Sequence, residues 1–212
     1  MLFSPYECIQ YLNPSTVKGV IHIGAHICEE YNYYRMLGIQ DNNIIWIEGN
    51  PDTYTKITEM YPSFRIFNGI CTDKDGNNVE FTITKNKNNN NSTDSSSIFK
   101  LGTHLKHHPF VIEDKVIKCT TTTVDTLLKN ENIADINMLN IDVQGAELLV
   151  CKGALNILKQ INYIYVEINK EELYVGCALV EDLDSFLEEH GFKRVLTKWT
   201  EFNWGDALYV RI

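Results

Sequence analysis

Short apolar runs that end at a glycine or a polar residue recur along the chain and alternate with longer amphipathic stretches. Five of these runs predict β-strands, at residues 20–23, 44–47, 64–67, 138–141 and 163–166. The amphipathic stretches predict helices at residues 28–37, 52–61, 124–130, 146–159 and 181–190. Because the strands are apolar almost without interruption, we expect a parallel sheet with helices on both faces.

The end of the chain predicts an antiparallel pair. Gly191 is suited to close the last helix, and residues 192–197 and 207–211 then predict two strands. The residues around 203–206 would form the turn between them. The predicted fold is an open, doubly wound α/β domain over residues 1–212, preceded within that range by an N-terminal arm or helix at residues 1–18.

Residues 85–115 interrupt this alternation. Residues 86–97 read NKNNNNSTDSSS, a polar run that cannot bury apolar surface and therefore predicts a loop. His104, His107 and His108 follow closely, and they suit either a metal site or a solvated loop. Since no cysteine or carboxylate stands near them at ligand spacing, we predict no metal site and interpret the segment as a polar insertion on the substrate side.

Composition narrows the class of protein. The chain has 212 residues, of which 44% are hydrophobic and 22% charged, and these values exclude disordered, collagen-like and coiled-coil chains. The net charge of −9 argues against sequence-independent binding to nucleic acid. We expect a cytoplasmic protein, a monomer or homodimer, without a membrane span or signal peptide, and with six reduced cysteines. The asparagine-rich run is a compositional hint of a viral or protist source, in which case the compartment is the host cytoplasm.

Polar residues follow each predicted strand, and the carboxyl ends of parallel strands meet at one edge of a sheet. Glu48 follows the second strand, 24 residues after Gly24, and could accept hydrogen bonds from both hydroxyls of a ribose. A helix-start acid that the helix dipole stabilises is the alternative interpretation of Glu48. The pair Gly24 and Ala25 allows the backbone to approach a ligand closely.

The motifs for pyrophosphate binding are absent from the sequence. His26 and Glu29 stand where the pattern GxGxxG requires glycine, and no GxxxxGK[ST] motif occurs. This argues against a nicotinamide-dependent dehydrogenase, the alternative enzyme class on such a sheet. A nucleoside without phosphates fits better, and S-adenosylmethionine is the commonest cofactor of that kind.

Three longer segments identify a family that the chain resembles. They are VIHIGAHICEE at 20–30, WIEGNP at 46–51 and LNIDVQGAELLVCKGA at 139–154. Shorter matches lie at residues 95–97, 123–125, 165–167 and 204–209. In this order the segments resemble the FkbM family of S-adenosylmethionine-dependent methyltransferases, and the block IDVQGAEL is the most specific of them. His22 stands where that family usually has an acid, and Cys28 stands where it often has glycine.

The resemblance implies a Rossmann-like sheet of seven mostly parallel strands with an antiparallel terminal strand, and O-methyl transfer to a hydroxyl of a sugar, glycan or glycosylated small molecule. S-adenosylhomocysteine would be the product. We expect the cofactor to contact strand-end and serine-run residues, with His22 as a polar partner of its methionine end. These residues are His22, Gly24, Ala25, His26, Glu48, Gly49, Asn50, Ile70, Cys71, Ser96, Ser97, Asp142 and Val143.

A sugar hydroxyl benefits from a general base, because it is a weak nucleophile at neutral pH. Asp142 is the first candidate, with cofactor or backbone hydrogen bonding as the equal alternative. His26 is the second candidate and could instead be a turn residue packed on adenosine. Glu147 is the third, although a first-turn acid is also explained by the helix dipole.

Glu167, Tyr174 and Trp204 are the predicted substrate-binding residues. A cap for the segment that follows the strand is the alternative interpretation of Glu167, and ordinary core or rim packing is the favoured alternative for the aromatic pair. A divalent cation on Asp142, Glu167 or Asp206 is possible, but no spacing indicates it. Two other functions stay open. One is a non-catalytic Rossmann-like module with a degenerate nucleoside pocket, and the other, less favoured because of the negative charge, is a nucleoside or RNA-cap methyltransferase.

Overall fold

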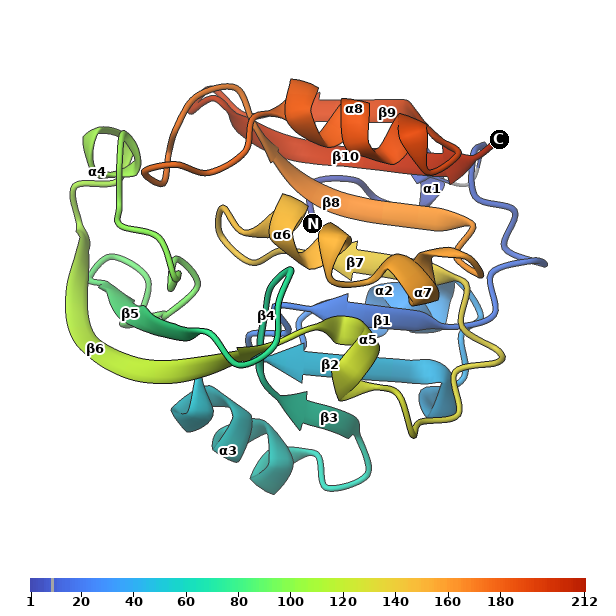
Figure 1. Ribbon diagram of the computed structural model, residues 1–212, viewed down its shortest axis with the longest axis horizontal. Coiled ribbons are helices and arrows are strands. Elements are labelled where there is room, and N and C mark those ends of the chain that lie inside the picture. The colour runs from blue at the N-terminus through green and yellow to red at the C-terminus, as the bar shows by residue number, and fades with distance from the viewer. Residues whose placement is uncertain (9) are drawn as a thin grey trace.

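The computed structural model describes residues 1–8 and 10–212, and its centre is a seven-stranded sheet in the order β3-β2-β1-β7-β8-β10-β9 (Figure 1). The strands of this sheet are β1 (Val20–Ile23), β2 (Ile44–Glu48), β3 (Arg65–Asn68), β7 (Met138–Ile141), β8 (Tyr163–Asn169), β9 (Phe192–Trp199) and β10 (Trp204–Arg211). Neighbouring strands are parallel except that β10 runs antiparallel to both β8 and β9. The predicted fold class is therefore confirmed.

Helices cover both faces of the sheet. Side chains alternate between the two faces along each strand, and every residue of β1, β2 and β7 is buried, so both faces need cover. In Figure 1, α5 (Val124–Leu127), α6 (Glu147–Lys152), α7 (Leu155–Leu158) and α8 (Val180–Glu189) lie in front of the sheet. The side chains that pack on the opposite face come from α1 (Pro5–Cys8), α2 (Tyr31–Met36) and α3 (Pro51–Met60). A short 3-10 helix, η1 (Asp41–Asn43), leads into β2.

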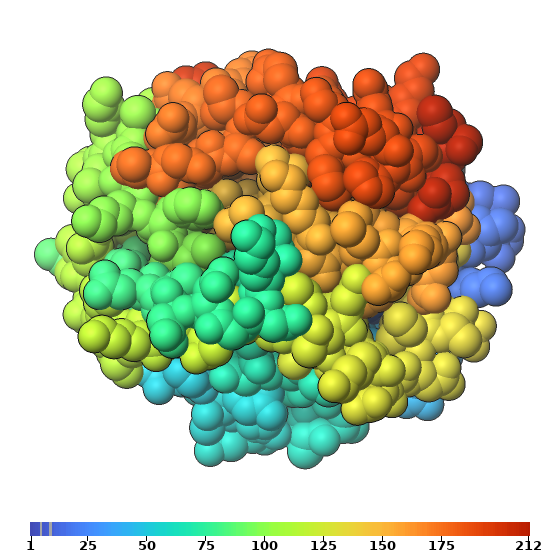
Figure 2. All heavy atoms as spheres, in the orientation of Figure 1, coloured from blue at the N-terminus to red at the C-terminus, as the bar shows by residue number. Residues whose placement is uncertain are grey.

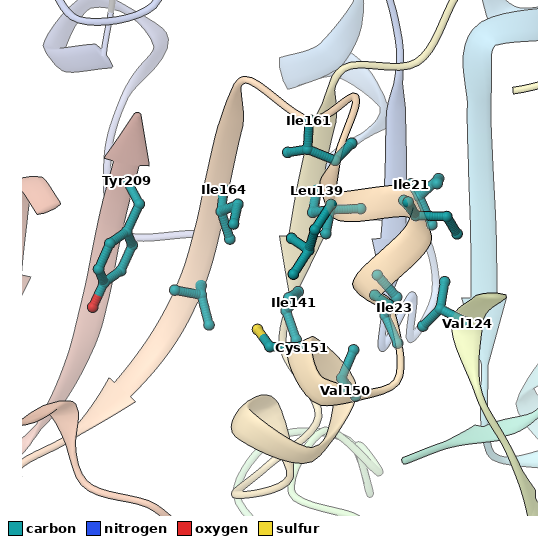
Figure 3. Close-up of a cluster of buried hydrophobic side chains, with 14 of the residues drawn as sticks. Ile21, Ile23, Val124, Leu139, Ile141, Val150, Cys151, Ile161, Ile164 and Tyr209 are labelled. Atoms are coloured by element: carbon teal, nitrogen blue, oxygen red, sulfur yellow. The ribbon is translucent and has the colours of Figure 1, made fainter. Parts of the chain in front are cut away.

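The front core consists of aliphatic side chains from adjacent central strands. Ile21 and Ile23 of β1 and Leu139 and Ile141 of β7 point to the same side and meet Val150 of α6 (Figure 3). All five side chains are at most 1% exposed. Full burial of such a side chain contributes about 1.5–3 kcal/mol, so this face holds the sheet and its helices in one unit.

The helices expected at 28–37 and 124–130 are shorter, at Tyr31–Met36 and Val124–Leu127, and two further boundaries differ from the sequence prediction. The single helix expected at 146–159 is wrong, because Gly153 separates α6 from α7. A Cβ at Gly153 would lie 2.0 Å from the carbonyl oxygen of Thr72, so the chain needs glycine where it passes this neighbour. The turn expected at 203–206 is also misplaced: β10 already begins at Trp204, after Asn203 turns the chain with a φ of 62°.

The predicted loop at 85–115 begins and ends inside strands that the sequence analysis missed. The strands β5 (Asn78–Asn86), β6 (Val111–Thr122) and β4 (Ile70–Cys71) form a second sheet in the order β4-β6-β5. Within 85–115 there is also a short helix, α4 (His104–His107). The apolar residues of β6 are separated by charged residues on a largely exposed strand, so no apolar run marks it.

This second sheet extends the molecule beyond the carboxyl ends of β1 and β2. Figure 2 shows the green atoms of residues 85–115 lying against the orange atoms that follow β8. Backbone groups contribute to this contact: Leu101 bridges to Tyr174, and the Gly102 amide donates to the Leu173 carbonyl at 2.7 Å. The insertion therefore covers the edge of the main sheet at which the predicted site residues lie.

Within the described residues, every helix is too short or too polar to cross a lipid bilayer.

Replacement of Leu139 by alanine should lower the free energy of unfolding by about 2–5 kcal/mol, because it leaves a cavity in the buried front core. Leu155→Ala is the matched control, since Leu155 is 43% exposed on α7 and should cost less than about 1 kcal/mol. Urea unfolding of both variants measures the difference. Equal losses of stability would contradict the described core.

Candidate active site

The site begins where β1 and β7 end side by side. Gly24 follows β1 with a φ of +89°, and a Cβ at this position would lie 1.7 Å from the carbonyl oxygen of Asp142. The Asp142 amide donates to the Ile23 carbonyl at 2.9 Å, which continues the strand pairing into the loop. Glycine is therefore required at position 24 for both its left-handed backbone and its lack of a side chain.

A cavity opens at this edge. Its walls combine glycines, apolar side chains and a few polar groups. Nine of the predicted cofactor residues line it: Gly24, His26, Glu48, Gly49, Ile70, Cys71, Ser96, Asp142 and Val143. The lining also includes residues that the sequence analysis did not select: Ile23, Gly69, Phe81, Thr93, Asp94, Ile98, Gln144 and Ala146.

Glu48 is the buried acid of this first cavity. Its Oε2 accepts a hydrogen bond from the His26 amide at 2.7 Å, and its Oε1 accepts one from the Asn50 amide at 2.7 Å. Burial raises the pKa of Glu48 to about 7, although these amide donors act in the opposite direction. Each carboxylate oxygen can accept a second hydrogen bond, so Glu48 is positioned by backbone and can still receive ligand hydroxyls.

His26 lines the first cavity from a strained turn, with a φ of 42°. Its Nδ1 lies 3.1 Å from both carboxylate oxygens of Glu29, and its Nε2 lies 3.3 Å from the Ser92 hydroxyl. Burial disfavours the charged ring, but the hydrogen bond to Glu29 and the charges of the neighbouring acids together outweigh it, and the pKa of His26 is raised. A raised pKa makes His26 less available as a base at neutral pH, and its contacts connect the first cavity to the asparagine-rich segment.

A second cavity adjoins the first. All three predicted substrate residues, Glu167, Tyr174 and Trp204, line it. Asp94, Asp142 and Gln144 line both cavities. Asp142, the first candidate base, therefore lies at the junction of the two spaces.

Gln144 organises this junction, although the sequence analysis did not select it. Its Nε2 donates to Asp142 Oδ1 at 2.6 Å and to Glu167 Oε2 at 3.1 Å, and the Tyr174 hydroxyl donates to its Oε1. Its backbone has a φ of 57°. The signal available in the sequence was its place between Asp142 and Gly145 in the IDVQGAEL block.

Carboxyl groups crowd the second cavity. Burial, and then the nearby charge of Asp206, raise the pKa of Asp142 to about 6. Burial, and then the charge of Asp142, raise the pKa of Glu167 well above its ordinary value. Asp206 accepts hydrogen bonds from the Leu2 amide and the Tyr165 hydroxyl, and burial raises its pKa. Asp142 is thus a stronger base than an exposed aspartate.

Glu147, the third candidate base, lines neither of these cavities. Its Oε1 accepts hydrogen bonds from the amides of Val143 at 3.1 Å and Gly145 at 3.0 Å. Burial raises its pKa to about 7. The geometry makes Glu147 a positioning residue that holds the loop between β7 and α6.

Four predicted cofactor residues also lie outside the two cavities. His22 packs on the other face of the sheet, where its ring centroid is 5.1 Å from that of Trp46 and its Nδ1 is 2.9 Å from the Tyr34 hydroxyl. Burial lowers its pKa to about 4. The structure therefore does not place His22 where it could meet the methionine end of a cofactor.

The other three predicted cofactor residues do not line either cavity but form hydrogen bonds with the backbone near it. Ala25 is 1% exposed and donates its amide to the Ile47 carbonyl. Asn50 caps α3 by accepting from the Asp52 amide at 3.0 Å. The Ser97 hydroxyl donates to the Gln144 carbonyl at 2.6 Å, so this serine fixes the backbone of a residue that both cavities share.

Metal ligands are not gathered in the part of the chain that the structure describes, where no group of three or more His, Cys, Asp or Glu side chains could hold an ion. This includes the acids of the second cavity. In the histidine segment, His107 pairs with Glu171 at 2.9 Å, and the ring of His104 packs against His108. The six cysteines are free thiols.

This strand order, with a cavity at the ends of β1 and β2, defines the Rossmann-like fold of class I methyltransferases. The model of the methyltransferase FkbM domain matches residues 22–194, which is most of the chain. The protein belongs to the FkbM methyltransferase family, as its motifs led us to expect.

Two curated relatives are similar over part of their length. The 2-O-methyltransferase NoeI of Sinorhizobium fredii is 29% identical over 113 residues, which are 53% of this chain and 46% of NoeI. The hexuronic acid methyltransferase AglP of Haloferax volcanii is 27% identical over 148 residues, which are 70% of this chain and 53% of AglP. The chain thus spans about half the length of these relatives.

A solved structure shares the fold. The methyltransferase FkbM from Methylobacillus flagellatus superposes with a TM-score of 0.54 at 15% identity, over 92% of this chain and 44% of that one. The M. capricolum TrmK, solved with S-adenosyl-homocysteine, superposes with a TM-score of 0.50 at 11% identity, over 100% of this chain and 68% of that one.

The raised pKa values predict that the ligand-free protein loses stability as the pH rises from 5.5 to 8. Glu48 and Glu147 ionise near pH 7 in the folded protein, but near pH 4.3 when unfolded, so the folded state binds more protons in this range. Their stabilising contribution is complete below the unfolded pKa and is lost as the pH passes about 7. In the Glu48→Gln variant, the fall in the free energy of unfolding between pH 5.5 and 8 should be smaller by about 2 kcal/mol.

Urea unfolding at a series of pH values measures this slope. The exposed Glu59 of α3 provides the matched control, and Glu59→Gln should leave the slope unchanged. A stability that rises between pH 5.5 and 8, with no difference between the two variants, would contradict the burial of these carboxyl groups.

Proposed function

We propose that the protein is an S-adenosylmethionine-dependent O-methyltransferase that acts on a hydroxyl of a sugar, a glycan or a glycosylated small molecule. The observation that carries this proposal is the meeting of two cavities at Asp142 and Gln144. Group transfer needs two neighbouring spaces, one for the donor and one for the acceptor, with a base between them.

The first cavity suits the nucleoside end of the donor. Ile70, Phe81 and Val143 offer apolar surface for the adenine, and Glu48 offers acceptor atoms for the ribose hydroxyls. A Cβ at Gly49 would lie 2.7 Å from the Cδ1 atom of Ile70, so a side chain at position 49 would displace Ile70 in this part of the wall. His26 and Asp142 border the same cavity near Gly24 and would face the methionine end.

Asp142 is the general base in our proposal. When bound, S-adenosylmethionine supplies a methyl carbon that its sulfonium has already activated. The protein therefore has to bring the acceptor oxygen into line and remove its proton. Asp142 can accept this proton at the junction of the cavities. Gln144 holds one carboxylate oxygen of Asp142 and leaves the other outside this contact.

The choice of a sugar acceptor is supported by chemistry and by relatives. The second cavity offers carboxylates, an amide and an aromatic ring, groups that bind polyhydroxylated rings. One curated relative is named as a hexuronic acid methyltransferase and another as a 2-O-methyltransferase. A non-catalytic module would bind the nucleoside but transfer no methyl group, and activity measurements separate the two.

Glu48→Ala should weaken binding of S-adenosylmethionine by about 10- to 100-fold, because a buried charged acceptor for the ribose is lost. Isothermal titration calorimetry with S-adenosylmethionine and S-adenosylhomocysteine measures the effect. Glu59→Ala, at an exposed acid of α3, should bind as the unaltered protein does. If the folded, unaltered protein does not bind either ligand at millimolar concentration, the methyltransferase proposal fails.

Asp142→Asn keeps the shape of the side chain but removes the base. We expect kcat to fall by about 10²- to 10⁴-fold, while the Kd for S-adenosylmethionine stays within tenfold. The kcat/KM of the unaltered enzyme should rise with pH through about 6 as Asp142 loses its proton, and the variant should lack this inflection.

The assay uses an acceptor found by screening sugars and glycans. Asp114→Asn is the control, since Asp114 is exposed on β6, pairs with Lys85 and lines neither cavity. An Asp142→Asn enzyme with unchanged kcat and pH profile would exclude Asp142 as the base.

A further inference from the structure

The second cavity is rich in carboxyl groups at its junction with the first. Asp94, Asp142, Glu167 and Asp206 all line it, and Glu167 and Asp206 are at most 8% exposed. The charge of Asp142 raises the pKa of Glu167, and the charge of Asp206 raises that of Asp142. These side chains already repel one another, so a further negative charge in this space would be costly.

Counterions for an anionic ligand are lacking here. Among the described residues that line the second cavity there is no lysine and no arginine. Burial and the neighbouring histidines lower the pKa values of His104 and His108, so both rings are neutral at physiological pH. The amine of Met1 pairs with Glu30 at 3.4 Å. A ligand carboxylate would thus meet acids, neutral rings and one amine that Glu30 already pairs.

An unsatisfied side chain in the same wall points to a ligand independently of the acids. His104 is 6% exposed and lines the second cavity, and its Nδ1 has no hydrogen-bond partner. A buried polar atom without a partner costs about 1–3 kcal/mol, and such atoms are commonly satisfied by a ligand or water. Neutral histidine can accept a hydrogen bond from a hydroxyl at a ring nitrogen.

The lining of the second cavity therefore suits a ligand that offers hydrogen-bond donors and carries no negative charge. A carboxylate accepts hydrogen bonds and a protonated carboxyl can also donate one, and a sugar hydroxyl can donate or accept, so a sugar suits these acids in either form. The Gln144 amide is already used between Asp142 and Glu167, so it is not free to donate to a ligand carboxylate.

We infer that the acceptor is a non-acidic sugar, recognised through its hydroxyl groups by Glu167, Asp206 and His104, and that uronic acids are rejected by the carboxyl groups of the second cavity. This inference rests on the proposed function, because it names the substrate class of the same site. Asp94 is exposed and lines both cavities, so in this inference it contributes to the rejection of acidic sugars.

The test is a methyl-transfer assay on matched pairs of oligosaccharides that differ only at C6, where one member carries a hydroxymethyl group and the other a carboxylate. Radiolabelled S-adenosylmethionine is the donor. In each methylated pair, the neutral member should have at least a tenfold higher kcat/KM. Asp94→Asn and Glu167→Gln should each narrow this ratio at least threefold. Glu188→Gln, at an exposed acid of α8, should leave it unchanged.

The outcomes distinguish failure of the inference about non-acidic sugars from failure of the proposed function. Equal rates, or a preference for the carboxylate member, overturn the inference and leave the proposed function standing. If S-adenosylhomocysteine binds but no sugar in either set is methylated, the proposed sugar acceptor is overturned together with the inference. Asp94 is exposed, so Asp94→Asn should fold normally. If the ratio of kcat/KM between the neutral and the carboxylate member is the same in this variant, charge repulsion is not the cause of the preference.

Discussion

The close approach of the Gly24 backbone to the Asp142 carbonyl is the constraint on which the site depends. β1 and β7 pair in parallel with Ile23 beside Ile141, so both chains leave the sheet at the same level. A side chain at position 24 would separate them, since its Cβ would lie 1.7 Å from the Asp142 oxygen. This contact sets the first loop, with His26, against the second, with Asp142 and Gln144, and so creates the junction between the two cavities.

The site places carboxyl groups in buried positions, where ionisation is unfavourable. Glu48, Asp142 and Glu167 sit at buried strand ends with pKa values raised mainly by burial. Groups that serve a ligand often reduce the stability of the free protein, because their interactions are completed only when the ligand binds. Here backbone amides on Glu48 and Gln144 on Asp142 offset part of that cost and fix the direction of each carboxylate.

Much of the sheet and its principal acids were predictable from the sequence, because both follow from local patterns. Apolar runs marked β1, β2 and β7, and Glu48 and Asp142 follow two of those runs directly. Gln144 and Asp94 were not found, since their roles arise from contacts across the fold. β6 was missed because its exposed strand has no apolar run. His22 lies on the opposite face of the sheet from the cavities, which the sequence did not indicate because alternation along a strand does not tell which face carries a cavity.

A crystal structure of the protein with S-adenosylhomocysteine would show whether the two cavities hold donor and acceptor. We predict that the ribose hydroxyls contact Glu48 and that the sulfur lies beside the junction of the cavities, next to Asp142. The ligand bound elsewhere, for example in the open groove between Asp73, Lys152 and Arg211, would contradict it. So would a ligand whose sulfur points away from Asp142, because the methyl group could then not reach the second cavity.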